Sequence, residues 1–211
     1  MFKWGQRKPI AGESGPTAVA DAPASAVTSK VLPRLLTALS GQAAPVLLDL
    51  GPVVGPNVAF FGEKLACKIH VEDLFASIEA RARRGASETE LDLAGRLRYA
   101  DGSVDGILCW DLFDFLPRRP AQALASRLAA MLRPGGVLYA FFGIGEAQLT
   151  HYTRFVVASG DTMRHRPYPA TPTRRNVLTN RDINRMFEGL EVVESVLLKT
   201  RTRETLFRKP S

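Results

Sequence analysis

The chain has 211 residues, of which 45% are hydrophobic and 23% are charged. This length supplies one sizeable core and is too short for two ordinary domains, and the composition excludes a wholly disordered or fibrous protein. Two cysteines, Cys67 and Cys109, stand among apolar residues with no His or Cys at ligand spacing. We therefore expect two buried thiols in a reducing compartment rather than a disulfide or metal framework.

No segment approaches the roughly 18 to 20 uninterrupted apolar residues that a membrane span needs. The basic start, residues 1–8, is not followed by an apolar stretch, which argues against a signal peptide. We expect a cytoplasmic protein.

The formal net charge of +7 is unevenly distributed. Residues 41–146 carry eleven Lys and Arg against thirteen Asp and Glu, whereas residues 147–211 carry twelve against six. A basic C-terminal third can attract nucleic acid, acidic substrates or an anionic membrane surface. No aromatic-interleaved RNA motif accompanies the charge, so we favour a solvated basic face over a nucleic-acid interface.

Residues 1–28 are rich in Ala, Gly, Pro and Ser and show no periodicity. We expect them to form a flexible arm ahead of a single domain over residues 29–211. Thr28 and Ser29 are candidate caps for a first helix, whose leucines share one face and which ends at Gly41.

From residue 46 onward, short apolar runs alternate with amphipathic segments. Strands are predicted over residues 46–50, 68–71, 91–93, 104–110 and 137–142, and helices over residues 57–66, 74–84 and 119–132. Strands and helices at this cadence predict βαβ units and a doubly wound, mostly parallel sheet covered on both faces.

The pattern changes after Gly145. Residues 158–177 are polar, with three prolines and a cluster of arginines, and are predicted to form a long loop; the arginines are Arg164, Arg166, Arg174 and Arg175. The loop can clamp a carboxylate, a phosphate or a polynucleotide, or it is simply solvated, and both interpretations stay open. Thr179 then caps a short helix, and residues 190–199 and 204–208 form two closing strands that a short turn makes antiparallel.

A glycine turn follows the first predicted strand, with the sequence Asp49-Leu-Gly51-Pro-Val53-Val-Gly55. Glycines there permit close approach of the backbone to a ligand at the carboxyl end of the sheet, where nucleotides bind in such folds. About twenty residues later Glu72 ends the second strand, where a carboxylate can accept both hydroxyl groups of a ribose. This pairing predicts a nucleotide site.

Four sequence motifs resemble those of the class I S-adenosylmethionine-dependent methyltransferases. They are Leu48-Asp-Leu-Gly51, Val71-Glu72, Tyr99-Ala-Asp-Gly-Ser-Val-Asp-Gly-Ile-Leu-Cys109 and Met131-Leu-Arg-Pro-Gly-Gly-Val-Leu138. Their order and spacing match that family over about residues 29–145, and the two closing strands resemble its terminal hairpin. The resemblance implies a Rossmann-like, seven-stranded sheet with one antiparallel C-terminal strand, and S-adenosylmethionine as the cofactor.

The resemblance also assigns roles to individual residues. Gly51 and Gly55 line the methionine and ribose part of the cofactor, and Asp49 supports the loop or faces the ammonium group. Glu72 holds the ribose hydroxyls, with Asp73 as the fallback if the register slips by one residue. The residues near the adenine are Asp92, Leu93, Trp110 and Asp111, and Trp110 either walls the adenine or is a core aromatic.

The chain departs from the family at two positions. Val53 replaces the middle glycine of the motif, where a branched side chain can narrow the pocket. Phe115 replaces a histidine that many relatives have after the fourth strand.

Catalytic residues are not identifiable from the sequence, because methyl transfer needs mainly the alignment of donor and acceptor, and a base only for a protonated acceptor. Glu146, His151 and Tyr152 lie where substrate is met, although each is more often an ordinary loop residue.

We expect a methyltransferase whose acceptor is a small molecule or a macromolecule. The alternative is a methyltransferase-like protein that has lost catalysis and acts as a binding or regulatory module, an interpretation favoured by Val53 and Phe115. A nicotinamide-binding dehydrogenase is the weakest option, because the regular Gly-x-Gly-x-x-Gly turn is missing.

Overall fold

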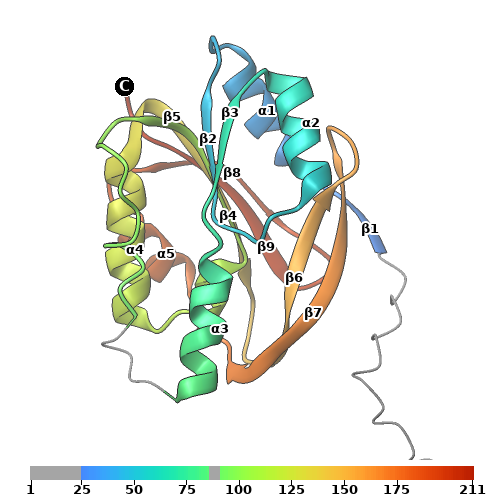
Figure 1. Cartoon of the computed structure of the whole chain (residues 1–211), viewed down its shortest axis with the longest axis vertical. Helices are drawn as coiled ribbons and strands as arrows, with labels where there is room; N and C mark the ends of the chain where they lie inside the picture. The colour runs from blue at the N-terminus through green and yellow to red at the C-terminus, as the bar shows by residue number, and fades with distance from the viewer. Residues whose placement is uncertain (1–24, 86–90) are drawn as a thin grey trace, which may run out of the picture.

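A computed structural model describes residues 25–85 and 91–211. In this part of the chain a six-stranded sheet stands at the centre, helices cover both of its faces, and a separate three-stranded sheet lies at one side (Figure 1). No helix of the described residues is long and apolar enough to cross a membrane.

The central sheet confirms the doubly wound, mostly parallel arrangement. Its strands, in spatial order, are β3 (Lys68–Val71), β2 (Val46–Asp49), β4 (Val104–Trp110), β5 (Leu132–Gly143), β9 (Thr202–Arg208) and β8 (Glu191–Leu197). Neighbours from β3 to β5 are parallel, whereas β9 runs antiparallel to both β5 and β8. All seven residues of β4 are buried, as expected of a strand covered on both faces.

The sheet has six strands rather than the expected seven, because residues 91–93 form no strand. Leu91 and Leu93 are buried in the core, as their apolar character predicts. The Asp92 carboxylate, however, accepts a hydrogen bond of 2.8 Å from the backbone N–H of Gly95, which turns the chain away from the sheet edge.

Five α-helices cover the sheet, and their predicted positions are largely confirmed: α1 (Leu32–Ser40), α2 (Gly55–Leu65), α3 (Leu74–Arg84), α4 (Arg118–Met131) and α5 (Asn180–Met186). The apolar sides of α1 and α2 pack on one face of the sheet, and those of α3, α4 and α5 pack on the other. Ser29 caps the first helix, since its Oγ accepts from the N–H of Leu32 at 2.7 Å. Thr179 opens α5 with a capping box.

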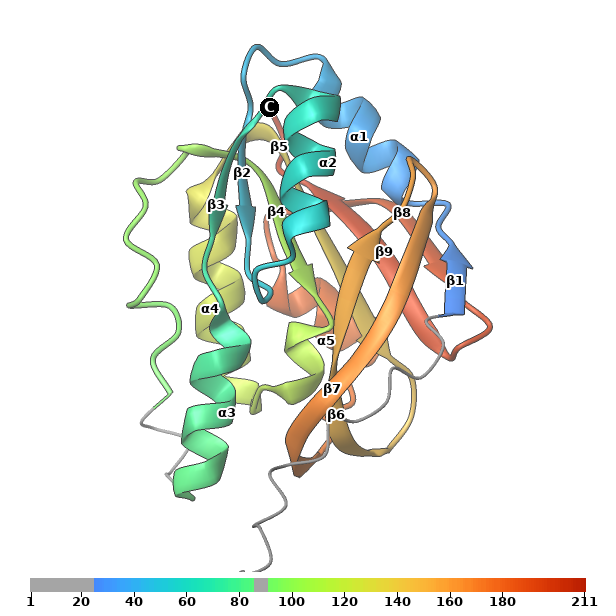
Figure 2. The same cartoon turned by 45° about the vertical axis from the view of Figure 1, so that its right-hand side comes forward.

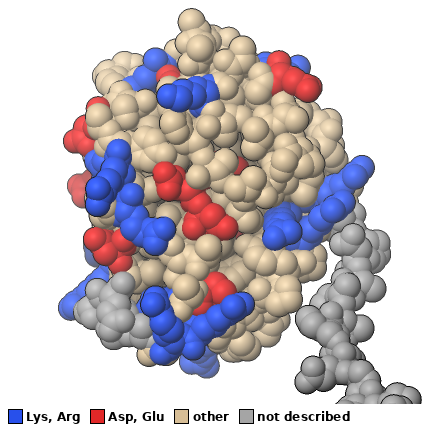
Figure 3. Space-filling view, in the orientation of Figure 1, with Lys and Arg blue, Asp and Glu red and all other residues tan. Residues whose placement is uncertain are grey.

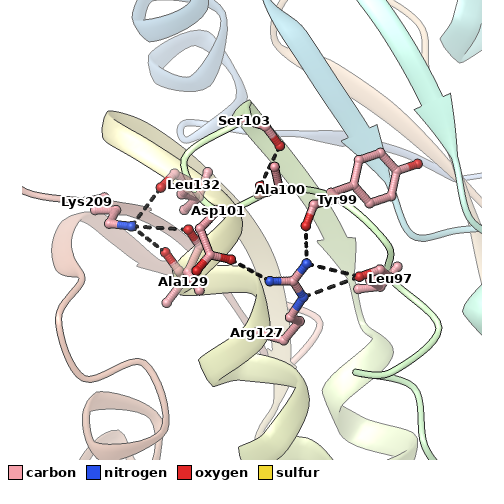
Figure 4. A network of polar contacts seen from close by, with 10 residues as sticks. Leu97, Tyr99, Ala100, Asp101, Ser103, Arg127, Ala129, Leu132 and Lys209 are labelled. Carbon is pink, nitrogen blue, oxygen red and sulfur yellow. Dashed lines mark hydrogen bonds and ion pairs between the residues drawn. The ribbon is translucent and has the colours of Figure 1, made fainter.

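Helix α4 also fixes the segment that leads into β4 (Figure 4). The Arg127 guanidinium donates to the carbonyl oxygens of Leu97 and Tyr99 and pairs with Asp101 at 2.6 Å. At the end of the same helix, Lys209 Nζ donates to the carbonyl of Leu132 at 2.7 Å and to that of Ala129 at 2.9 Å. A cation there satisfies carbonyls that the helix leaves unpaired.

The prediction of a loop over residues 158–177 is wrong. Its larger part is strand β7 (Thr162–Arg174), which forms an antiparallel hairpin with β6 (Gln148–Val157). Phe155, Val157 and Met163 are buried on one side of this hairpin, and that burial stabilises the strands.

The prolines of this segment are typical of a loop, but their positions are compatible with an edge strand. Strand β1 (Ser25–Thr28) pairs only with residues 162–165 of β7. Pro167 and Pro169 lie beyond that pairing, where β7 is an edge strand and a missing N–H is tolerated. Strand β1 itself consists of residues expected in the flexible arm, and the rest of that arm, residues 1–24, lies outside the described residues.

Candidate functional site at the carboxyl edge of the sheet

The glycine turn and the acid after the next strand are adjacent, as the sequence predicts. The backbone N–H of Glu72 donates to the carbonyl of Asp49 at 2.8 Å, and that of Leu74 donates to the carbonyl of Leu50 at 3.2 Å. These bonds hold Glu72 beside the loop that begins at Leu50. Asp73, the fallback acid, has another role, because its Oδ1 accepts from the N–H of Ala76 at 3.0 Å and so caps α3.

Glu72 has a partner that sequence reasoning missed. The Tyr99 hydroxyl donates to Glu72 Oε1 at 2.9 Å. Burial, the hydrogen bond to Glu72 and the charge of Glu72 together raise the pKa of Tyr99 to about 12, so the phenol stays a donor at neutral pH. Arg127 holds the carbonyl of Tyr99, as described above, so α4 positions the phenol indirectly. In the sequence, Tyr99 is marked only by its position at the start of the motif Tyr99–Cys109, which resembles the methyltransferase family.

Asp49 lies beneath the loop and is 4% exposed. Its Oδ1 accepts from the N–H of Gly51 at 2.9 Å and from Nε1 of Trp110 at 2.6 Å. Burial raises the pKa of Asp49 to about 6, although the bonds from Trp110 and Gly51 oppose that shift. The carboxylate therefore organises the loop.

Trp110 stands directly against Gly51. A Cβ at Gly51 would come within 2.7 Å of the indole ring, which is closer than real Cβ atoms approach. Trp110 is 3% exposed and has a left-handed backbone with φ of 52°, which is uncommon for a bulky residue. Of the two interpretations left open above, the structure favours the core aromatic, because the ring is buried between Gly51 and the hairpin.

Phe155 of the hairpin covers the other side of that indole. The two rings are stacked, with centroids 5.2 Å apart and 7° between their planes. Phe141 of β5 stacks on the far side of Phe155 at 4.7 Å. Three aromatic side chains thus join β4, β6 and β5 at the carboxyl edge of the sheet.

The hairpin is fastened to helices on both sides (Figure 2). From α2, Asn57 Nδ2 donates to the carbonyl of Phe155 at 2.7 Å, and Asn57 Oδ1 accepts from the N–H of Val157 at 2.8 Å. From α3, Glu79 accepts from the hydroxyl of Tyr152 at 3.0 Å and from the N–H of Thr171 at 2.9 Å. Burial alone would raise the pKa of Glu79, but these bonds and that from Arg83 lower it to about 2.

Two further acids follow β4: Asp111, which is half-buried, and Asp114, which is buried. Burial, with the nearby charge of Asp114, raises the pKa of Asp111 to about 8. Burial also raises the pKa of Asp114 to about 6, against the N–H of Gly143 at 2.9 Å and the Arg175 guanidinium at 3.0 Å. Burial therefore favours the protonated form of Asp111 at neutral pH.

The remaining residues considered for substrate contact differ in their burial. Phe115 packs against Phe75 and Tyr152 and is a core residue. Tyr152 is buried and His151 is exposed. Glu146 lines a cavity of about 410 Å³ together with Arg174 and Arg175.

Three of the expected cofactor residues, Gly55, Asp92 and Leu93, line cavities, and these are two separate cavities. Gly55 lines a cavity of about 470 Å³ with Val53 and Val54, and Val53 is 69% exposed there. Asp92 and Leu93 line another of about 520 Å³, against Ser77 and Ala80 of α3. Among the described residues, no group of three or more His, Cys, Asp or Glu is placed to hold a metal ion.

No protein-family model and no curated protein matches the chain. Solved structures do match it. One is the PH0226 protein from Pyrococcus horikoshii OT3, with a TM-score of 0.53 and 15% identity over 85% of this chain and 87% of that one. Another is an S-adenosylmethionine-dependent methyltransferase from Clostridium acetobutylicum ATCC 824, with a TM-score of 0.52 and 12% identity over 88% and 93% of the two chains. The chain therefore has the class I methyltransferase fold that its motifs resemble.

Proposed function

We propose that this protein is an S-adenosylmethionine-dependent methyltransferase, with its cofactor held between Glu72 and the loop that ends at Gly55. The observation that carries the proposal is the pair of backbone bonds that fix Glu72 beside the glycine turn, at the carboxyl edge of a sheet with this fold. Nucleotides bind at this edge of α/β sheets, and a carboxylate there suits ribose hydroxyls.

The acidic end of the site fits a ribose. Tyr99 donates to Oε1 of Glu72, so the second carboxylate oxygen of Glu72 is left to accept from a ligand. Asp73 caps α3 through its Oδ1, so we assign the ribose hydroxyls to Glu72 rather than to Asp73.

The glycine end of the site fits a ligand at Gly55 rather than at Gly51. Trp110 fills the space above Gly51, whereas a Cβ at Gly55 would meet no atom within 4 Å. The exposed side chain of Val53 stands in the cavity beside Gly55, so it narrows that cavity without closing it. We therefore assign the backbone approach to Gly55 and regard Gly51 as a packing position for Trp110.

S-Adenosylmethionine supplies a methyl group that its sulfonium already activates, so the main task of the protein is to hold donor and acceptor in line. Glu72 and the loop hold the donor, and hydrogen bonds to α2 and α3 fix the β6–β7 hairpin beside the same edge. The acceptor is a small molecule or a macromolecule.

The test is calorimetric titration of S-adenosylmethionine and S-adenosylhomocysteine into the purified protein. We expect micromolar binding, weakened about 10- to 100-fold by Glu72→Gln, because charge-assisted hydrogen bonds to ribose are lost. Asp73→Asn is the matched control, since asparagine also caps helices and binding should be unchanged. Absence of binding at millimolar cofactor would overturn the proposal and leave the non-catalytic alternative.

A further inference from the structure

A cavity of about 470 Å³ separates the β6–β7 hairpin from the start of α2. Residues 53–56 form one wall. Arg154 of β6 and Arg164 and Arg166 of β7 stand on the other, and none of the lining residues is acidic. Basic side chains gather on the flank of the molecule where the hairpin lies (Figure 3).

The strand register brings these three arginines together. Arg154 lies directly opposite Arg166, and Arg164 is two residues away on the same face of β7. The intervening residue, His165, is half-buried and packs on Phe155. Like charges directly opposite each other in a sheet are destabilising. A hairpin that places three guanidinium groups around one cavity is therefore less stable without an anion than with one.

The three arginines have no acidic partner among the described residues, whose ion pairs all involve other cations. Arg154 stacks on the ring of Tyr168 at 4.7 Å, which orients the guanidinium without neutralising it. All three side chains are exposed and can reach a ligand in the cavity.

The other two arginines of the same segment, Arg174 and Arg175, lie away from this cavity. Arg175 pairs with Asp114 and donates to the carbonyl of Gly145 at 3.2 Å. Arg174 lines a separate cavity that contains Glu146. The arginine cluster expected from the sequence is thus divided by the structure, and its first half, Arg164 and Arg166, joins Arg154 at the cavity beside α2.

We infer that the cavity between residues 53–56 and the Arg154, Arg164 and Arg166 side chains binds an oxyanion, a phosphate or carboxylate, carried by a small molecule. Guanidinium groups match such oxygens bidentately, and the volume is that of a small-molecule site. Val54 and Gly55 connect the cavity to the proposed cofactor loop. We assign the anion to a methyl acceptor that lies beside the cofactor, and this assignment rests on the proposed function.

The probe is inorganic pyrophosphate, titrated by calorimetry into the full chain at constant ionic strength and followed also by thermal unfolding. We expect binding that Arg166→Gln and Arg164→Gln each weaken about tenfold or more, through loss of charge-assisted bonds. Without pyrophosphate, Arg166→Gln should unfold at the same or a higher temperature, because a like-charge contact is removed. Arg119→Gln, an exposed arginine of α4, is the matched control and should bind as the unmodified chain does.

Each other outcome is informative. Absence of pyrophosphate binding, or equal binding by Arg166→Gln, overturns the anion site. Loss of S-adenosylmethionine binding in Arg166→Gln shows that the arginines hold the cofactor carboxylate and overturns the acceptor assignment. Salt-dependent binding of single-stranded RNA without pyrophosphate binding overturns the small-molecule assignment. Pyrophosphate binding by a protein that does not bind S-adenosylmethionine supports the anion site and overturns the methyltransferase proposal.

Discussion

At the residue scale, Trp110 has the largest effect on the candidate site. Its indole bonds to the buried carboxylate of Asp49, stacks on Phe155 and lies against the Cα of Gly51. Gly51 is thus a glycine because of a neighbouring side chain, and a ligand is not needed to explain it. The backbone of Trp110 has a positive φ, a strained state that such surrounding contacts can maintain.

Gly51→Ala tests that contact. The added methyl group would lie within 2.7 Å of the indole, so we expect a loss of about 1–3 kcal/mol in the free energy of unfolding, from overpacking. Chemical denaturation measures it. Gly55→Ala is the matched control, because a Cβ there meets nothing within 4 Å, and its stability should change little. Equal losses for both variants would contradict the assigned roles.

Asp49 provides a pH test. Its pKa in the folded protein is raised from 3.8 to about 6, so the folded state holds the proton more tightly and this group costs stability as pH rises from about 4 to above 6. Asp49→Asn keeps an oxygen acceptor and removes the charge. The stability gained by the variant should therefore grow over that range, to about 3 kcal/mol at most. Denaturation curves at pH 4.5 and 7.5 measure it, and a pH-independent difference would refute the assignment.

At the element scale, the β6–β7 hairpin is the feature that distinguishes this site. It stands between α2 and α3 and is tied to each by buried or half-buried hydrogen bonds. The same hairpin supplies Phe155 to the aromatic stack and the arginines to the proposed anion cavity. The β6–β7 hairpin therefore lies over the carboxyl edge of the sheet and also places positively charged side chains beside it.

Asn57→Ala tests the attachment of the hairpin to α2. It leaves the carbonyl of Phe155 and the N–H of Val157 buried without their partner, so we expect a loss of about 2–4 kcal/mol in stability. Hydrogen exchange at the Val157 amide should accelerate more than exchange in β4. The exposed Asn184 of α5 gives a control in Asn184→Ala, and a loss no larger than that of this control would show that the bonds contribute nothing.

At the scale of the whole molecule, buried hydrogen bonds join segments of the core that are far apart in the sequence. Glu204 of β9 is fully buried and accepts hydrogen bonds from the hydroxyls of Ser29 and Tyr139, so it joins the start of α1 to β5. Burial raises the pKa of Glu204, opposed by these two bonds. A buried acid in this position makes the packing of α1 depend on the C-terminal strands.

Tyr139→Phe tests this closure. The substitution removes the hydroxyl group, and with it one hydrogen-bond donor to the buried carboxyl group of Glu204. We expect the free energy of unfolding to fall by about 1–3 kcal/mol. Tyr168→Phe is the control, because Tyr168 is engaged through its ring rather than its hydroxyl, and should stay within about 0.5 kcal/mol. Thermal and chemical unfolding measure both, and equal values would contradict a role for the Tyr139 hydroxyl.

The sequence by itself determined the parts that depend on local periodicity and turn chemistry. β3 and α3 have the predicted bounds, Thr179 caps α5, and the parallel direction of β3, β2, β4 and β5 follows from the alternation of strands with helices. The adjacency of Glu72 to the glycine turn follows from the same rule, because neighbouring parallel strands end at one edge.

Only the tertiary structure decided how that edge is filled. Trp110 and Asp49 are 61 residues apart, and Asn57 and Phe155 are 98 apart, so no local pattern announces either contact. The same holds for β7, whose prolines suggest a loop until the neighbouring strands show which part of it is an edge. Burial against distant partners overrides local preference in each case, and these long-range contacts close Gly51, leave Gly55 open and separate the arginines into two groups.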